Sequence, residues 1–216
     1  MAKAFIFDMD GVVVDSEHNW EPYDRAIMER FFDTRIREAI GTNIGLGISG
    51  LYEKAKALGS TITYEEIRQA YDEAALKVYE TAPITEGITR LAQKLIEWDF
   101  ALALVTSSPH TWIDQVVPRL SFKDKFSLIV SIADQRDLKP KPAPDSYLFA
   151  MKSLGVTPAE SIVLEDSNYG IAAGKASGAF TIGFTGNLVK GYRQEVTADA
   201  TADTMDAVIA IVEKRL

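Results

Sequence analysis

The sequence predicts an α/β protein with an open parallel sheet and a helical insert after the first strand, and three observations support this. Five short apolar runs do not alternate with polar residues, which is typical of strands buried on both faces of a parallel sheet. These runs are residues 4–7, 101–105, 128–130, 162–164 and 180–183. Segments with helical spacing lie between the runs, so we expect helices on both faces of the sheet. The third observation is a strand-free interval too long for a connecting loop.

That interval is the helical insert, residues 17–82. One stripe at helical spacing is formed by Trp20, Tyr23, Ile27 and Phe31. Thr63 and Glu66 have the spacing of a capping box, which indicates that another helix begins there. The glycine-rich residues 41–50 favour a bend between helices. We therefore expect an α/β core of residues 1–16 and 83–216, and an all-helical cap domain of residues 17–82.

Three later segments have the apolar spacing of helices that pack on a sheet. The first has Leu91, Leu95 and Trp98 on one face, and the second has Leu148, Met151 and Leu154. The last follows Asp203, a candidate N-cap, and carries Met205, Val208, Ile209 and Val212.

The composition is that of a globular protein, with 47% hydrophobic and 25% charged residues among 216. The 23 Lys and Arg against 31 Asp and Glu leave a net charge of −8, which argues against nucleic acid or membrane partners. The absence of cysteine excludes disulfides, thiolate metal sites and a cysteine nucleophile. The first apolar run ends at Asp8, too early for a signal peptide, and no run is long enough to span a membrane. We expect a cytoplasmic protein, and a monomer by default.

Two carboxylates, Asp8 and Asp10, follow the first strand. In open α/β sheets, ligands bind beyond the carboxyl ends of the strands. One carboxylate can act as nucleophile or metal ligand while the other acts as general acid and base. The alternative is that this segment is an ordinary turn.

Two more acids, Glu165 and Asp166, follow the strand expected at 162–164 and reach the same edge of the sheet. On their own they could cap the helix that follows. Four clustered carboxylates repel one another, however, unless a cation lies between them. Oxygen ligands of this kind suit Mg²⁺.

Two further segments could hold an anion. The hydroxyls of Thr106 and Ser107, with the backbone N–H groups of a strand-to-helix turn, make a small anion cradle. Such residues often only cap a helix. Lys141 lies between Pro140 and Pro142, which fix the backbone and keep the ammonium group in place. The alternative for this segment is a rigid surface loop.

These segments occur in one order along the chain: DMDGVVVDS at 8–16, TSS at 106–108, KPAPD at 141–145 and EDSNYGI at 165–171. In this order they resemble the haloacid dehalogenase superfamily of aspartate-based phosphotransferases, in its subgroup with a helical cap. The resemblance covers essentially the whole chain and is greatest to sugar-phosphate phosphatases and β-phosphoglucomutase. It implies a Rossmann-like core sheet.

The resemblance also implies roles for individual residues. It makes Asp8 the nucleophile that forms an aspartyl-phosphate, and Asp10 the acid that protonates the leaving oxygen and then activates water. It implies that Thr106 and the backbone beside it, with Ser107, hold the phosphoryl oxygens. It implies that Lys141 pairs with the phosphate and with the nucleophile.

The same resemblance implies that Mg²⁺ is the cofactor. Its ligands would be Asp8, Asp166 and the backbone carbonyl of Asp10. Glu165 would contact the ion or support one of its ligands.

We therefore expect an Mg²⁺-dependent phosphatase that hydrolyses a small phosphorylated metabolite, a sugar phosphate, through an aspartyl-phosphate. One alternative is a mutase like β-phosphoglucomutase, which must hold a second phosphate. Residues 41–51 contain no Lys or Arg that could bind this second phosphate, which argues against a mutase. Lys54 and Lys56 follow shortly after this segment and keep the mutase alternative open. Haloacid dehalogenation needs neither a metal nor a second acid, so Asp10 and Asp166 argue against it. A non-catalytic binding protein would not be expected to keep all these groups.

Overall fold

The central sheet of the protein is parallel throughout. The structure is a computed structural model that describes residues 3–135 and 137–216. Its six described strands have the order β3-β2-β1-β4-β5-β6. They are β1 (Lys3–Phe7), β2 (Phe100–Thr106), β3 (Phe126–Ser131), β4 (Ser161–Glu165), β5 (Phe180–Phe184) and β6 (Ala200–Ala202). The predicted α/β class is confirmed, and each of the five apolar runs lies inside one of the first five strands.

The sequence did not indicate β6, the short strand at one edge of the sheet. It has only three residues, Ala-Thr-Ala, and pairs in parallel with β5. A strand this short carries no apolar run, so nothing in its pattern distinguishes it from a loop.

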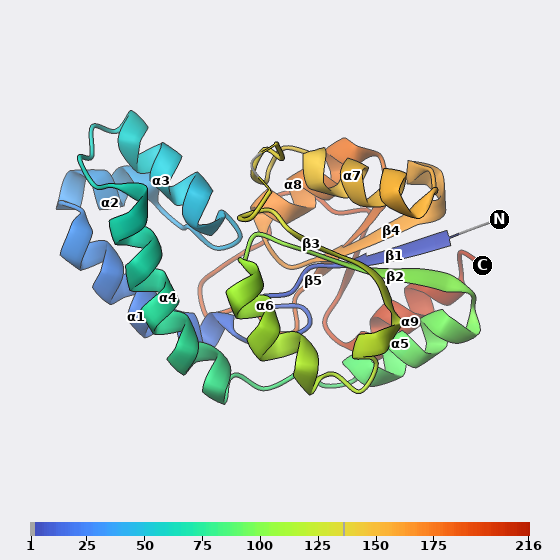
Figure 1. The fold of residues 1–216 in the computed structure, drawn as a ribbon. Helices are drawn as coiled ribbons and strands as arrows, with labels where there is room; N and C mark the ends of the chain where they lie inside the picture. The colour runs from blue at the N-terminus through green and yellow to red at the C-terminus, as the bar shows by residue number, and fades with distance from the viewer. Residues whose placement is uncertain (1–2, 136) are drawn as a thin grey trace.

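Helices cover both faces of the sheet (Figure 1). Phe5 and Phe7 of β1 belong to one core, together with residues of α5 (Ile88–Glu97) and α9 (Met205–Glu213). Ala4 and Ile6 belong to the other core, beneath α7 (Asp145–Leu154) and α8 (Asn168–Ser177). This alternation follows from the two-residue repeat of a strand, and both sets are apolar because both faces are buried.

The helical insert lies beside the carboxyl ends of the strands (Figure 1). It contains α1 (Glu17–Phe31), α2 (Thr34–Ile40), α3 (Gly47–Ala57) and α4 (Tyr64–Thr81). The capping box predicted for α4 is present, with Thr63 and Glu66 each accepting a hydrogen bond from the other's backbone N–H. Trp20 of α1 contacts Trp112 of α6 (His110–Val116), a core helix that supports the insert. The division into two domains at these boundaries stays a prediction.

The buried face of α7 differs from the predicted one. The sequence suggested a stripe that includes Leu148, but this side chain is 44% exposed. Met151 is buried as predicted, but the other buried residues are Ser146, Tyr147 and Ala150. Tyr147 points inward because its hydroxyl donates a hydrogen bond to the buried carboxylate of Glu165. A polar contact therefore sets the rotation of this helix.

Two helix boundaries also differ from expectation. The N-cap of α9 is Thr204, whose hydroxyl accepts a hydrogen bond from the N–H of Ala207, so Asp203 lies one residue outside the cap. Helix α3 begins at Gly47, so only the first part of residues 41–50 forms the bend. None of the helices in residues 3–135 and 137–216 is long and apolar enough to span a membrane.

Candidate active site

Three carboxylates meet where β1 and β4 end. The two strands are parallel neighbours with Phe7 beside Leu164, so Asp8 and Glu165 emerge side by side. The oxygens of Asp8, Glu165 and Asp166 lie within 4.8 Å of one another. All three residues are buried.

The ammonium group of Lys141 lies inside this cluster. Its Nζ is 2.6 Å from Oδ1 of Asp8 and 2.5 Å from Oε1 of Glu165. The side chain is only 2% exposed, although Lys141 belongs to a loop between β3 and α7. The expectation that the proline-flanked segment positions a lysine agrees with this geometry, whereas the alternative of a surface loop does not.

The site holds more negative than positive charge. Burial raises the pKa of Asp8 well above its usual value, and the pairing with Lys141 only partly opposes this. Burial also raises the pKa of Asp166, with the charges of Glu17 and Glu165 adding to the effect. Burial alone would lower the pKa of Lys141, but the charges of Asp8 and Glu165 raise it. Three acids surround one ammonium, so a further cation would be stabilised here.

The donor set fits a hard divalent cation. Oδ2 of Asp166 is buried and has no hydrogen-bond partner among the described residues. A buried carboxylate oxygen without a partner is costly unless something binds it. The ligands available are oxygens only, which Mg²⁺ prefers. Asp8, Asp166 and Glu165 are therefore the side chains that could hold the ion predicted from the sequence.

The carboxylate of Asp10 has different surroundings from the other three. Its Oδ1 accepts hydrogen bonds from the hydroxyls of Ser16, at 2.6 Å, and Tyr79, at 2.7 Å. Its Oδ2 accepts one from the Ser108 hydroxyl at 2.7 Å. We expected four clustered carboxylates, but the structure gathers three and directs Asp10 towards hydroxyl donors. Ser16 and Tyr79 were not singled out in the sequence, and Tyr79 gave no signal because it occupies an apolar position of a helix.

The turn after β2 provides the expected polar loop, residues 106–108. Thr106 is buried, and its hydroxyl accepts a hydrogen bond from the backbone N–H of Ser108 at 3.0 Å. The Ser107 hydroxyl is buried and has no partner among the described residues. It is therefore available to a ligand, and both residues line the same cavity as Asp8 and Lys141.

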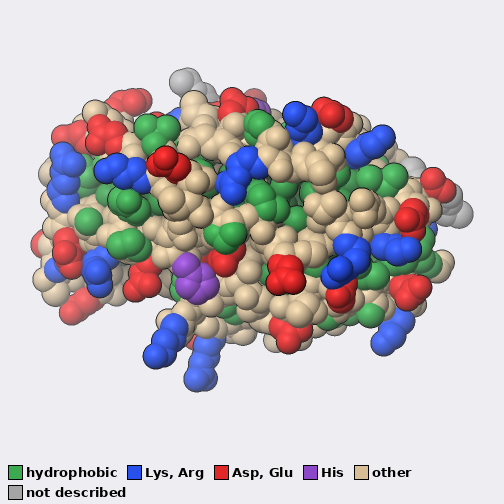
Figure 2. All heavy atoms as spheres, turned by 90° about the horizontal axis from the view of Figure 1, so that it is seen from below, with side chains coloured by type: hydrophobic (Ala, Val, Ile, Leu, Met, Phe, Trp, Pro, Cys, Tyr) green, Lys and Arg blue, Asp and Glu red, His purple; other side chains and the backbone are tan. Residues whose placement is uncertain are grey.

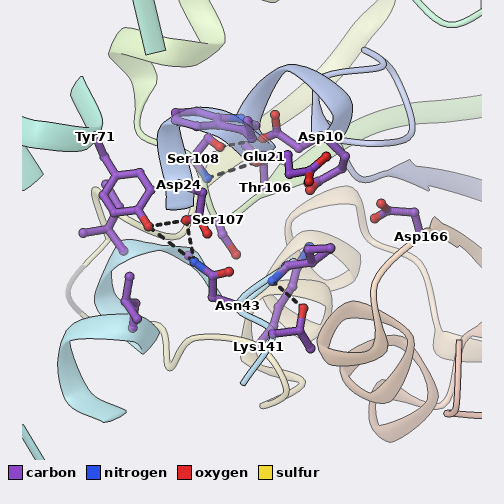
Figure 3. A pocket seen from close by; sticks show the side chains of 18 of the residues that line it. Asp10, Glu21, Asp24, Asn43, Tyr71, Thr106, Ser107, Ser108, Lys141 and Asp166 are labelled. Atoms are coloured by element: carbon purple, nitrogen blue, oxygen red, sulfur yellow. Dashed lines mark hydrogen bonds between the residues drawn. The ribbon is translucent and has the colours of Figure 1, made fainter. Parts of the chain in front are cut away.

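This cavity lies between the sheet edge and the helical insert and has a volume of about 360 Å³. Figure 3 shows Asp10, Thr106 and Lys141 around it together with Asn43 and Tyr71 of the insert. Such a volume suits a small metabolite. The polar groups contributed by the insert were not assigned from the sequence.

Acids outnumber bases on the insert side of the cavity. Glu17, Glu21 and Asp24 line it there, with Arg25 as the one cation that the described residues of the insert contribute. Burial and the nearby charges of Asp10 and Asp8 raise the pKa of Glu17 to about 8. The positive charge of the site is thus concentrated at Lys141, next to the acids that end β1 and β4.

Comparison with known proteins matches this arrangement to one family. The model of haloacid dehalogenase-like hydrolases matches residues 5–184. A relative from Bacillus subtilis (strain 168), "putative phosphatase YhcW", is 30% identical over 182 residues, 82% of this chain and 81% of the relative. Hexitol phosphatase B of Escherichia coli (strain K12) is 28% identical over 178 residues, 81% of this chain and 79% of the relative.

The chain is also similar in fold to a solved structure. The putative β-phosphoglucomutase from Thermotoga maritima superposes with a TM-score of 0.70 and 25% sequence identity. The match covers 99% of this chain and 100% of that one.

Proposed function

The chain belongs to the haloacid dehalogenase-like hydrolase family, and on this premise we propose that it is an Mg²⁺-dependent phosphatase of a small phosphorylated metabolite. The observation that carries the proposal is the buried group of Asp8, Lys141, Glu165 and Asp166 beside the loop of residues 106–108. Phosphoryl transfer depends mainly on positioning and charge neutralisation, and this group offers both.

In the proposed mechanism, Asp8 is the nucleophile. One of its carboxylate oxygens attacks phosphorus, the bond from phosphorus to the leaving oxygen breaks, and an aspartyl-phosphate forms. Lys141, 2.6 Å from Asp8 Oδ1, orients the carboxylate and offsets charge on the phosphoryl oxygens. Thr106 and Ser107 bind those oxygens through hydroxyl and backbone groups.

Asp10 is the proposed proton-transfer group. It donates a proton to the leaving alcohol in the first step and accepts one from the attacking water in the second. The water oxygen bonds to phosphorus, the bond to Asp8 breaks, and inorganic phosphate is released. Asp10 must therefore be protonated before the first step, and the contacts with the hydroxyls of Ser16, Tyr79 and Ser108 orient its side chain for both transfers.

Asp8, Asp166 and the backbone carbonyl of Asp10 are the proposed ligands of Mg²⁺, with Glu165 in contact with the ion or supporting them. When bound, the ion would neutralise negative charge on the transferring phosphoryl group. In the chain as described, Glu165 also accepts hydrogen bonds from Lys141 and Tyr147, so it orients the lysine as well.

We propose a sugar phosphate or a similar polyol phosphate as the substrate. The cavity of about 360 Å³ supports a small metabolite. The similarity to hexitol phosphatase B supports a hydroxylated one.

The mutase alternative has the support of the β-phosphoglucomutase relative from Bacillus subtilis, which is 29% identical. A mutase needs a cation to hold a second phosphate. Lys54 does not line the cavity, because its ammonium group donates hydrogen bonds to the Ile40 carbonyl and the Tyr169 hydroxyl. Arg25 does line it, but Glu21 and Asp24 line the cavity too and would repel a second phosphate, so the phosphatase is favoured.

Phosphate release from p-nitrophenyl phosphate and from a hexose 6-phosphate tests the proposal. We expect EDTA to abolish release and Mg²⁺ to restore it. Full turnover in metal-free buffer would contradict the metal assignment, and the absence of turnover with either ester in Mg²⁺ would contradict the phosphatase. Conversion of β-glucose 1-phosphate to glucose 6-phosphate, with a bisphosphate primer, would favour the mutase instead.

A further inference from the structure

Three polar side chains from separate parts of the insert meet at the cavity (Figure 3). Asp24 lies on α1, Asn43 lies between α2 and α3, and Tyr71 lies on α4. Asp24 Oδ1 accepts hydrogen bonds from Asn43 Nδ2 at 2.7 Å and from the Tyr71 hydroxyl at 2.5 Å. Asn43 Nδ2 is also 3.3 Å from the Tyr71 hydroxyl. The carboxylate of Asp24 is therefore fixed in orientation by two partners.

Both of these partners use the same oxygen of Asp24. Within residues 3–135 and 137–216, no hydrogen bond reaches Oδ2 of Asp24 or Oδ1 of Asn43, and both residues are partly exposed and line the cavity. Two acceptors held in a fixed arrangement can receive hydrogen bonds from a ligand without a further loss of side-chain entropy.

The surrounding groups indicate the class of ligand. An anionic group would be repelled by the carboxylates of Asp24 and Glu21, which line the same side. Thr42 and Ser107 add hydroxyls that both donate and accept. A polyhydroxylated neutral group matches this mixture, because each hydroxyl can donate to one neighbour and accept from another. Arg25 makes an anionic group the rival to be tested.

Close contacts place this arrangement near the reacting end of the cavity. A Cβ on Gly47 would lie 2.8 Å from the Cβ of Ser107, and one on Gly45 would lie 2.1 Å from the Ser167 hydroxyl. The loop that carries Asn43 therefore lies directly against the segments after β2 and β4. An ester with its phosphate at Thr106 and Ser107 would extend its alcohol towards Asp24.

We propose that Asp24, oriented by Asn43 and Tyr71, is the specificity-determining residue that binds the hydroxyl groups of the leaving alcohol. The proposal rests on the phosphatase activity proposed above and specifies the part of the substrate that the insert recognises. The substrate is then a phosphate monoester of a neutral polyol, with no second anionic group.

The experiment compares kcat/KM for four esters in the full-length protein with Mg²⁺. The first is a hexose 6-phosphate, whose alcohol carries hydroxyls. The second, 2-phosphoglycolate, carries a carboxylate, and the third, O-phosphoethanolamine, carries an ammonium group. The fourth, p-nitrophenyl phosphate, carries none of these groups. Asp24→Asn keeps an acceptor for Asn43 and Tyr71 but replaces the free oxygen with an NH₂ group. Glu53→Gln is the matched control, because it removes an exposed acid of α3 outside the cavity.

We expect Asp24→Asn to lower kcat/KM for the hexose phosphate about 10- to 100-fold, the value of a hydrogen bond to a charged group. Turnover of p-nitrophenyl phosphate should stay near that of the wild type, and Glu53→Gln should change neither. Tyr71→Phe removes one of the two donors to Asp24 and should give a smaller loss of the same selectivity. If Asp24→Asn does not fold, the Tyr71→Phe variant tests the proposal in its place.

Each failure has a distinct signature. Equal losses for all esters, or no loss for the hexose phosphate, would overturn the subsite while leaving the phosphatase intact. A wild-type preference for 2-phosphoglycolate or O-phosphoethanolamine would overturn the polyol class. No release from any ester, p-nitrophenyl phosphate included, would overturn the phosphatase and the subsite with it.

Discussion

Asp8 and Asp10 are separated by one residue but have different surroundings. Asp8 is buried beside two other acids and an ammonium group. Asp10 accepts hydrogen bonds from three hydroxyls, one of them from Tyr79 of the helical insert. Two carboxylates in contrasting environments can carry contrasting chemical roles. This contrast supports a nucleophile and a separate proton-transfer group.

Substitutions of these two residues should have different consequences. Asp8→Asn should abolish turnover, because an amide does not attack phosphorus. Asp10→Asn should still allow phosphorylation by an ester with a good leaving group, but should slow hydrolysis of the intermediate about 10²- to 10⁴-fold. Rapid quenching followed by mass spectrometry should find the phosphoryl group on Asp8. Label on another residue would contradict the assignment.

Lys141 should support stability as well as chemistry. Lys141→Met leaves buried acids without their cation, so in metal-free buffer the free energy of unfolding should fall by about 3–5 kcal/mol. Mg²⁺ should restore part of this, because a ligand that binds only the folded state stabilises it.

The control for Lys141 is Lys139→Met, two residues away in the same segment. Lys139 is exposed, so the free energy of unfolding should change by less than about 0.5 kcal/mol. Chemical denaturation with and without Mg²⁺ measures both variants. Equal values for the two would mean that the contacts of Lys141 do not stabilise the fold.

At the scale of elements, the predictable features were those that repeat along the chain. The buried strands were visible as apolar runs, and the acids after them as polar residues at a shared sheet edge. β6 was not visible because three residues cannot form a run. The rotation of α7 was not visible either, because it depends on the contact between Tyr147 and Glu165, which are distant in sequence.

The residues missed in the site share a physical reason. Tyr79, Asn43 and Asp24 contribute through contacts between segments, and no local pattern records which segments meet. Ser16 lies only six residues from Asp10, but its role depends on how the turn between them folds. Asp24 is separated from Tyr71 by 47 positions in the chain. A tyrosine or asparagine at such a position looks like an ordinary helix or loop residue. Functional residues on the core strands were therefore easier to predict than those on the insert.

For the whole molecule, the arrangement of insert and core decides what the cavity can hold. Asp8, Asp10, Thr106 and Asp166 lie at or just after strand ends and Lys141 lies in the loop after β3, whereas Asp24, Asn43 and Tyr71 come from the insert. The face seen in Figure 2 carries acidic and basic side chains interspersed over its whole extent, with no large patch of one sign. The concentration of acids around the cavity is thus a feature of the site and not of that face.

A substitution at the contact between insert and core tests whether the insert acts mainly in substrate recognition. Gly45 has a φ of +75° and no room for a side chain, because a Cβ would lie 2.1 Å from the Ser167 hydroxyl. Gly45→Ala should displace the insert and lower kcat/KM for a hexose 6-phosphate about 10- to 100-fold, since small misplacements have large effects on orientation. The decrease in kcat/KM should be smaller for p-nitrophenyl phosphate, because contacts remote from the phosphate contribute less to its binding.

Gly59→Ala is the matched control for this change. Gly59 also has a positive φ, +88°, but nothing lies within 4 Å of a Cβ built there. Both variants therefore carry a similar backbone strain of about 1–2 kcal/mol, and only Gly45→Ala meets the core. Thermal unfolding first checks that the two variants are equally stable. Steady-state kinetics with both esters then separates the effect of backbone strain, which both variants share, from displacement of the insert, which only Gly45→Ala causes. If Gly45→Ala lowered turnover of the two esters equally, the contribution of the insert would lie in the catalytic centre, where Tyr79 already contacts Asp10, and its proposed role in substrate selection would be wrong.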